Sequence, residues 1–343
     1  MKAKFIISKR TVMEQYNKIV NLADKVSYSS KTNQVVTKIL EKETDCFFSV
    51  HFFNELKHIE DKSRVLFLAQ AWNFEEIDDL IKQGVRNFVL DNESDLDVLI
   101  SYLEKNDVKI NLQLRLKIRE NSLRTERYFV FGMTAKVINE RIEQLSQHDK
   151  IEELGIHFHR KTQNMSEWNY IYELSTNIEK EVLQKISWIN MGGGLPSEYA
   201  NTNVKVISGI LEKIKEFREW LSLNEIKLML EPGRFIAAPA GKLITKIIGI
   251  HDNNIIVNAS VYNTDMDALI VPVKLLVEGE LSQGEGKSFV IKGITPCSMD
   301  LFRYRVWLNN PKVGDELVFL NAGAYNFSTN FCDLEELETE VKE

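Results

Sequence analysis

The sequence predicts an α/β fold: a closed (β/α)8 barrel of the TIM type, followed by a mostly antiparallel β domain. From residue 25 to residue 233, short apolar stretches alternate with amphipathic helical patterns, and the connections between them are short. After Arg234 the helical patterns give way to β-rich segments separated by turns. Eight strand-and-helix repeats over roughly two hundred residues suit a closed barrel better than an open sheet.

The barrel strands are expected where apolar runs are too short to form helices. They are Lys25–Ser30, Asp45–Val50, Val65–Ala69, Asn87–Asp91, Ile110–Leu116, Glu153–His159, Ser187–Met191 and Lys227–Leu230. Helices are expected at Val35–Lys42, Glu75–Gln83, Asp95–Glu104, Val137–Gln147, Trp168–Glu181 and Val204–Leu221. Strands connected through helices run parallel, so their carboxyl ends meet at one rim of the barrel.

The C-terminal part is predicted to be a second domain made of strands. The expected strands are Lys242–Ile250, Ile255–Ala259, Ala268–Leu276, Lys287–Ile291 and Glu316–Leu320, with no helix between them. The opening segment, Ala3–Ser8, is expected to join this domain as a further strand. The predicted division is therefore a barrel at 10–235 and a β domain at 236–343 that includes residues 1–9.

Composition excludes several classes of protein. The 343 residues carry a formal charge of −7 and are 44% hydrophobic, as expected of a soluble protein with one or two domains. The acidic balance argues against nucleic-acid binding, no apolar run approaches the ~20 residues that span a bilayer, and no signal-peptide core opens the chain. Three cysteines without CxxC spacing favour neither disulfides nor zinc. The sequence thus predicts a cytoplasmic enzyme or binding protein.

Polar residues follow four of the predicted barrel strands, at the rim where barrel active sites lie. They are Lys31, His159, the run Gly192-Gly193-Gly194, and the pair Glu231 and Arg234 in Glu-Pro-Gly-Arg. A glycine run after a strand suits a phosphate, and the carboxylate and guanidinium suit a ligand that also has a protonatable ring. Pyridoxal phosphate is such a ligand.

Each of these signals has an ordinary alternative when it is taken alone. Lys31 could be a surface charge, either His157 or His159 could be a packed core histidine, and a glycine triplet is often a turn. The spacing of the two histidines is compatible with a metal, but no third ligand accompanies them, so no metal is expected. It is the convergence on one rim that indicates a site.

Six segments, in order, resemble those of the alanine-racemase-like, fold-type III pyridoxal-phosphate decarboxylases, which include ornithine, diaminopimelate and carboxynorspermidine decarboxylases. The first three contain Lys31 in Tyr-Ser-Ser-Lys-Thr-Asn, His159 and Thr162 in Gly-Ile-His-Phe-His-Arg-Lys-Thr-Gln, and Gly192–Gly194 in Met-Gly-Gly-Gly-Leu-Pro. The others are Glu231-Pro-Gly-Arg234, the cysteine segment from Pro296-Cys297 to Asp300, and Gly323-Ala324-Tyr325.

The resemblance implies a role for each segment. Lys31 would form the Schiff base with pyridoxal phosphate, Glu231 would keep the pyridine nitrogen protonated, and His159 would stack on the ring. The phosphate would be held by Arg234, Tyr325, Thr162 and the backbone of Gly192, Gly193 and Gly194. Cys297 would donate a proton after carbon dioxide leaves, and in this family it comes from a second subunit. A homodimer with shared active sites is therefore expected.

The pattern departs from the family where a basic substrate tail would be held. Ser298 and Asn258 stand where related enzymes carry acids, and Lys161 replaces a glycine before the phosphate-binding Thr162. Asp265, Asp267 or Asp300 could bind a substrate amine in place of the missing acids. Arg303 or Arg305 could bind a substrate carboxylate, but these arginines could equally be surface charges or form a dimer salt bridge.

The resemblance therefore predicts a decarboxylase that removes the α-carboxylate of a diamino acid or a related amino acid, with a link to polyamine biosynthesis. A racemase of the same fold is the alternative, and Glu231 argues against it because such racemases place an arginine at the ring nitrogen. A non-catalytic regulator of a decarboxylase is a further alternative. Cys46 is assigned to the core, whereas the role of Cys332 stays open.

Overall fold

The structure is a computed structural model, and it describes residues 2–118, 130–160, 169–202 and 204–343. The chain divides into two compact units. One, the barrel unit, contains Asn17–Leu195 and Lys205–Gly233. The other, the β unit, contains Met1–Tyr16, Pro196–Val204 and Arg234–Glu343.

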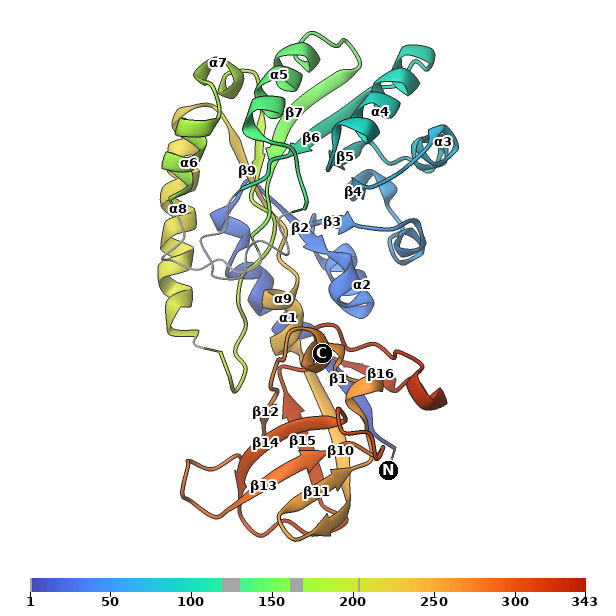
Figure 1. Ribbon diagram of the computed structural model, residues 1–343, viewed down its shortest axis with the longest axis vertical. Coiled ribbons are helices and arrows are strands. Elements are labelled where there is room, and N and C mark those ends of the chain that lie inside the picture. Colours follow the sequence, from blue (N-terminus) through green and yellow to red (C-terminus); the bar gives the residue numbers. More distant parts are fainter. Residues whose placement is uncertain (1, 119–129, 161–168, 203) are drawn as a thin grey trace. The chain divides into compact units, whose positions relative to one another are not determined.

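The barrel unit is a closed barrel of eight parallel strands (Figure 1). The strands are β2 (Lys25–Ser29), β3 (Phe47–Val50), β4 (Val65–Ala69), β5 (Asn87–Leu90), β6 (Ile110–Arg115), β7 (Ile151–His157), β8 (Trp188–Asn190) and β9 (Lys227–Leu230). The barrel closes where β2 pairs with β9, with Lys25 opposite Met229. All eight predicted strands are confirmed, and each boundary falls within two residues of its prediction.

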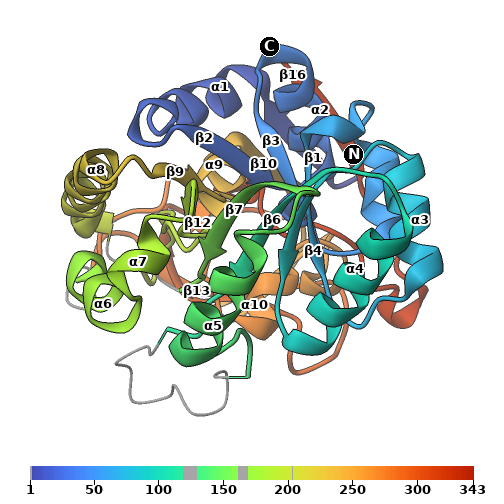
Figure 2. The same cartoon turned by 90° about the horizontal axis from the view of Figure 1, so that it is seen from above.

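Helices surround these strands, as Figure 2 shows. They are α2 (Gln34–Glu43), α3 (Phe74–Lys82), α4 (Glu93–Lys105), α5 (Ala135–Leu145), α6 (Tyr170–Asn177), α7 (Lys180–Leu183) and α8 (Ile207–Leu223). Asparagine caps start several of them; Asn73 forms a capping box with Glu76 at the start of α3. The single helix predicted at Trp168–Glu181 is wrong, because Ile178 is extended and separates α6 from α7. Trp168 lies outside the described residues.

The β unit is an eight-stranded, mostly antiparallel sheet with the order β12-β15-β10-β11-β13-β14, to which β1 and β16 are added through β10. Its strands are β1 (Lys4–Ser8), β10 (Gly241–His251), β11 (Asn254–Val257), β12 (Leu276–Val277), β13 (Lys287–Lys292), β14 (Leu301–Leu308), β15 (Glu316–Leu320) and β16 (Glu338–Lys342). The helix α1 (Lys9–Asn17) follows β1, and the helix α9 (Arg234–Ala240) precedes β10. The predicted participation of the N-terminal strand is confirmed, since β1 pairs with β10.

The strand predictions for the β unit are wrong at one segment and miss two further strands. The strand expected at Ala268–Leu276 is instead the short helix α10 (Met266–Ile270), followed after Pro272 by the two-residue strand β12. A short apolar run does not distinguish a strand from a buried helix, and proline interrupts this one. The strands β14 and β16 were missed because Arg303 and Arg305 in β14, and the charges of β16, obscure their apolar pattern.

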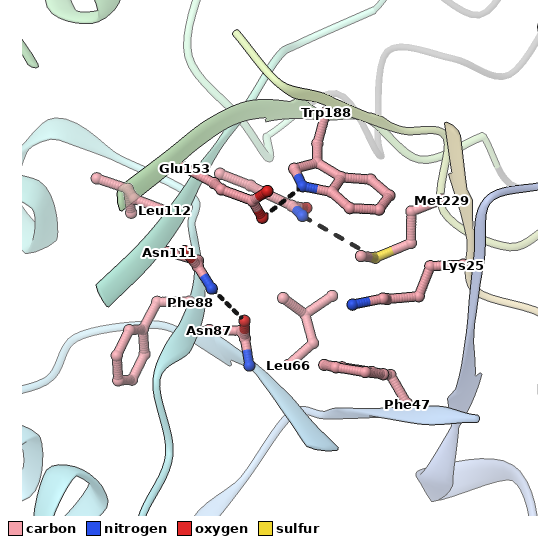
Figure 3. Close-up of a pocket in the computed structure, with 11 residues that line it drawn as sticks. Lys25, Phe47, Leu66, Asn87, Phe88, Asn111, Leu112, Glu153, Trp188 and Met229 are labelled. Atoms are coloured by element: carbon pink, nitrogen blue, oxygen red, sulfur yellow. Dashed lines mark hydrogen bonds between the residues drawn. The ribbon is translucent and has the colours of Figure 1, made fainter. Parts of the chain in front are cut away.

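The amino ends of the barrel strands enclose a small cavity of about 40 Å³. Figure 3 shows Lys25 reaching into it beside Phe47 and Trp188. The ammonium lies 3.8 Å from the ring centroid of Phe47 and 5.4 Å from that of Trp188, so the chain's own cation already occupies these aromatic faces. Because barrel active sites form at the opposite, carboxyl ends, we assign this cavity to the packing of the barrel floor.

Among the described residues, no helix is long and apolar enough to cross a membrane. The same residues contain no group of three or more metal-binding side chains that could hold a metal ion.

Candidate active site

In the barrel unit, the ends of four strands bring together Lys31, His159, the glycine run and Glu231. The connecting contacts are direct: the Gly193 N–H donates to Nδ1 of His159 at 3.2 Å, and the Glu231 N–H donates to the Gly192 carbonyl at 2.8 Å. Lys31 lies close enough to Glu231 for the carboxylate to influence its pKa. Parallel strands end at the same rim, and this is why residues so distant in sequence meet.

Glu231 is a buried carboxylate, 5% exposed, directly after β9. Its Oε1 accepts a hydrogen bond from Nδ2 of Asn190 at 2.7 Å, and its Oε2 lies 3.6 Å from Nε2 of His157. The second distance is too long for a hydrogen bond, so we treat that contact as electrostatic. Burial raises the pKa of Glu231, but His157 and the Asn190 hydrogen bond outweigh it and lower the pKa to about 2. Glu231 is therefore an anion at neutral pH.

Lys31 lies in a short 3₁₀ turn, Ser30–Thr32, between β2 and α2. The turn is anchored because Oδ1 of Asn33 accepts the N–H groups of Val35 and Val36, which caps α2. Although the side chain keeps solvent exposure, the surrounding rim desolvates the ammonium and lowers its pKa, while Glu55 and Glu231 oppose that shift. A lysine with a lowered pKa offers more of the neutral amine, which is the nucleophile.

The glycine run exposes its backbone at positions that a side chain could not occupy without strain or a clash. Gly192 and Gly194 have positive φ angles of 65° and 87°. A Cβ on Gly193 would lie 2.6 Å from the backbone oxygen of Glu231, and one on Gly192 would lie 2.8 Å from Nδ1 of His159. The pKa of His159 is lowered, first by desolvation and then by His157 and Arg115, which favours the neutral ring that accepts from Gly193.

Several barrel residues at this rim escaped the sequence analysis. His51 follows β3, and its backbone N–H donates to Oε1 of Glu55 at 2.9 Å. Nδ1 of His51, Oε2 of Glu55 and both ring nitrogens of His157 are buried without a hydrogen-bond partner among the described residues. Buried polar atoms normally have partners, so this group indicates a site built for a polar ligand. The position of His51 and Glu55 after a barrel strand was the signal that could have found them.

In the β unit, Arg234 begins α9 and is held by its neighbours. Its Nη1 donates to Oη of Tyr199 at 3.0 Å and also forms an ion pair with Asp267, while its guanidinium lies 5.1 Å from the ring centroid of Tyr325. Asp265 is buried, and burial together with Asp267 raises its pKa to about 7. The structure thus brings Arg234, Tyr325 and Asp267 together and leaves Asp265 with a strongly perturbed carboxyl group.

Asp300 and Arg303 are occupied by bonds within the β unit. Oδ1 of Asp300 accepts the N–H of Val261 at 2.9 Å, and its Oδ2 accepts the N–H and the hydroxyl of Thr295 at 3.0 and 2.8 Å. The guanidinium of Arg303 donates to both carboxylate oxygens of Glu280 and to the carbonyls of Leu275 and Arg305. Both side chains thus have hydrogen-bond partners within the β unit, and their role at the substrate stays a prediction.

The other residues singled out in the sequence differ in exposure, and two of them lie outside the described residues. Ser298 is exposed, and Cys297 is half-buried beside Tyr262. Asn258 accepts the N–H of Lys246 at 2.7 Å through its Oδ1. Thr162 and Lys161 lie outside the described residues. Cys46 is 1% exposed, with burial raising the pKa of its thiol to about 12, in keeping with its assignment to the core.

We expect Asp300→Ala to lower the free energy of unfolding by about 2–4 kcal/mol, because the buried N–H of Val261 and the half-buried N–H of Thr295 lose their acceptor. Urea unfolding measures the effect. Asp149→Ala, at a side chain that is 89% exposed, is the matched control and should change stability by less than about 0.5 kcal/mol. Unchanged stability combined with a raised KM would assign Asp300 to the substrate instead.

The chain is similar to known proteins in sequence. Residues 9–238 match a family described as "Pyridoxal-dependent decarboxylase, pyridoxal binding domain". A diaminopimelate decarboxylase from Aquifex aeolicus is 24% identical over 296 residues, which are 77% of this chain and 66% of that protein. The chain therefore matches slightly less than two thirds of this relative's length. Antizyme inhibitor 2 from Xenopus laevis is 22% identical over 341 residues, covering 89% of this chain and 72% of that protein.

Solved structures share the fold. The lysine/ornithine decarboxylase from Vibrio vulnificus, solved in complex with cadaverine, superposes with a TM-score of 0.80 at 20% identity. The similarity covers 99% of this chain and 94% of that one. At this level of identity the likeness concerns the fold.

Proposed function

This chain belongs to the family of pyridoxal-dependent decarboxylases, and from that premise we propose that it removes the α-carboxylate of a diamino acid or a closely related amino acid. The observation that carries the proposal is the state of Glu231. A buried carboxylate with a pKa of about 2, placed near Lys31, is suited to keep a pyridine nitrogen protonated.

The residues at the barrel rim fit pyridoxal phosphate. Lys31 offers an aldehyde an amine whose lowered pKa favours its neutral form, and Glu231 offers a fixed negative charge. Gly192 and Gly193 offer backbone that a Cβ would obstruct. The unpartnered atoms of His51, Glu55 and His157 supply further polar groups. When bound, the cofactor supplies the electron sink that accepts the electrons of the departing carboxylate.

Each of the chain's own residues has a defined task in this proposal. Lys31 would hold the cofactor through its aldehyde until the substrate amine takes its place, Glu231 would keep the ring nitrogen protonated, and His159 would lie at the ring. Arg234, Tyr325 and Thr162 join the glycine run in holding the phosphate, on the strength of the family resemblance. Because a guanidinium has five N–H donors, Arg234 could contact the phosphate while it keeps its ion pair with Asp267.

We assign the acid that binds the far end of the substrate from the hydrogen bonds that the candidate residues already form. Asp300 and Arg303 are committed to internal hydrogen bonds, which leaves Asp265 and Asp267 as the acids for a distal amine. Asp265 is the stronger choice, because Asp267 already pairs with Arg234. The pKa of Asp265 is raised, and a nearby substrate ammonium would lower it and favour the carboxylate. We also propose a cytoplasmic homodimer and a role in polyamine biosynthesis, both from the resemblance.

Release of carbon dioxide from a panel of ornithine, lysine, arginine, diaminopimelate and carboxynorspermidine tests the function. We expect turnover of at least one amine-bearing substrate, with a visible cofactor absorbance that borohydride fixes onto Lys31. Inversion at the α-carbon without release of carbon dioxide would instead support the racemase. Absence of both cofactor and turnover would instead favour a non-catalytic regulatory homologue.

A further inference from the structure

Tyr262 and Cys297 form a side-chain pair in the β unit, with Oη of the tyrosine 3.0 Å from Sγ of the cysteine. The two residues come from different segments: Tyr262 from the 3₁₀ turn Val261–Asn263, and Cys297 from the loop between β13 and β14. Either atom could donate, but a phenolic hydroxyl is a far stronger donor than a thiol and a thiolate can only accept, so we assign the hydroxyl as the donor.

The tyrosine is held in place from several sides. Its ring stacks on Phe331 with the centroids 4.0 Å apart and the planes at 25°. Its carbonyl oxygen accepts both the N–H and the hydroxyl of Thr329, at 2.9 and 2.8 Å. The turn itself begins with Ser260, whose hydroxyl oxygen accepts the Tyr262 N–H in a capping box with Asn263. The hydroxyl is therefore presented to the sulfur by a fixed ring.

The cysteine segment is tied to the same turn. Asp300 bridges the two, because one carboxylate oxygen accepts the Val261 N–H and the other accepts the N–H and hydroxyl of Thr295. The Thr295 hydroxyl oxygen also accepts the Cys297 N–H at 3.4 Å. Both halves of the pair thus rest on one hydrogen-bonded frame, and the distance between hydroxyl and sulfur is set by that frame.

We propose that Tyr262 is the positioning residue of Cys297: its hydroxyl holds the sulfur in one orientation and stabilises the thiolate. Where this bears on catalysis it rests on the proposed function. There, the Sγ–H bond breaks, the proton goes to the substrate carbon that has lost carbon dioxide, and the sulfur keeps the electron pair. The hydrogen bond from Tyr262, which stays protonated, stabilises the thiolate left behind.

The charges around the sulfur agree with this assignment. The hydrogen bond from Tyr262 is the largest influence that lowers the pKa of Cys297, and the backbone N–H groups of Met299 and Asp300 act in the same direction. Desolvation and the Asp300 carboxylate oppose them. The same bond raises the pKa of Tyr262 to about 12, with smaller contributions from burial, Asp300 and Cys332, as expected for a donor to an anionic sulfur.

The test is the pH profile of Cys297 alkylation by iodoacetamide, followed by mass spectrometry of the peptide. The Cys332→Ser background removes the exposed thiol, and Cys46 is buried and stays unreactive. We expect Tyr262→Phe, which keeps the ring, to move the midpoint upward by about one pH unit. A less acidic thiol is a better nucleophile once ionised, so the rate at neutral pH should fall only about threefold.

Tyr304→Phe, at a tyrosine that is 72% exposed on β14, is the matched control and should leave the midpoint unchanged. An equal midpoint in the Tyr262→Phe protein, or an equal shift in the control, would overturn the proposal. In the decarboxylation assay Tyr262→Phe should lower kcat with little change in KM. Because alkylation needs no substrate, a protein that shows the thiol shift but releases no carbon dioxide contradicts the proposed function and leaves this inference standing.

Discussion

Glu231→Gln is expected to lower the rate of decarboxylation about 10²- to 10³-fold with little change in the fold. Glutamine has nearly the same shape and can still accept from Asn190, but it removes the buried negative charge that lies 3.6 Å from His157. Without that charge the pyridine nitrogen of the cofactor is held less strongly in its protonated form. Steady-state release of carbon dioxide measures the loss, and the cofactor's visible spectrum reports the change at the ring.

Glu219→Gln, at an exposed position of α8, makes the same chemical change away from the site and should leave the rate unaltered. A Glu231→Gln enzyme of normal rate would remove the main support for the proposed function. A gain of racemase activity in this variant would show that the carboxylate decides between the two reactions.

The same residue gives a prediction for acid stability. Since the pKa of Glu231 is lowered in the folded protein to about 2 from an ordinary 4.5, its stabilising contribution is complete above about pH 4.5. That contribution is lost as the pH falls towards 2, and the shift corresponds to about 3 kcal/mol. Urea unfolding between pH 2 and pH 7 should therefore show a shallower acid loss in Glu231→Gln than in the unmodified protein.

Lys31→Ala is expected to lower decarboxylation at least about 10³-fold and to abolish attachment of the cofactor by borohydride. The reason is chemical: the alanine has no amine to bind the aldehyde or to displace the product. Absorbance of the purified protein and mass spectrometry after reduction measure the attachment, independently of turnover. Lys31→Arg keeps the charge without a nucleophilic amine, and it should fail in the same way.

The matched control for this variant is Lys38→Ala, at an exposed lysine one helix turn into α2. It should retain both attachment and rate. If borohydride fixed the cofactor to a lysine other than Lys31, the assignment of the site would be wrong, whereas the assignment of the reaction would depend on turnover alone.

Much of the barrel could be predicted because its signals are local. Each strand is a short apolar run, and most helices have their own period, several with a cap such as Asn33 or Asn73. Neighbours along the chain therefore suffice to place most of them. The β unit was harder for the same reason. In Ala268–Leu276 the local pattern allows two structures, and only packing selects the helix Met266–Ile270.

For the candidate site, too, local features could be predicted and long-range features could not. The sequence by itself determined which side chains follow the strands: Lys31, His159, Gly192–Gly194 and Glu231 owe their common rim to the parallel order of the strands. The sequence also indicated Cys297, because the segment from Pro296 to Asp300 resembles the cysteine segment of the family. What it could not determine was which polar groups remain available, because a hydrogen bond depends on partners far away in the chain.

Only the tertiary structure decided those pairings. Asp300 and Arg303 have the right charges to hold a substrate, yet Val261, Thr295 and Glu280 already occupy them. The pKa of Glu231 is likewise set by Asn190 and His157, which come from other strands. Protonation and hydrogen bonding are properties of a three-dimensional environment, in which burial and neighbouring charges decide the state of a group whose identity alone the sequence records.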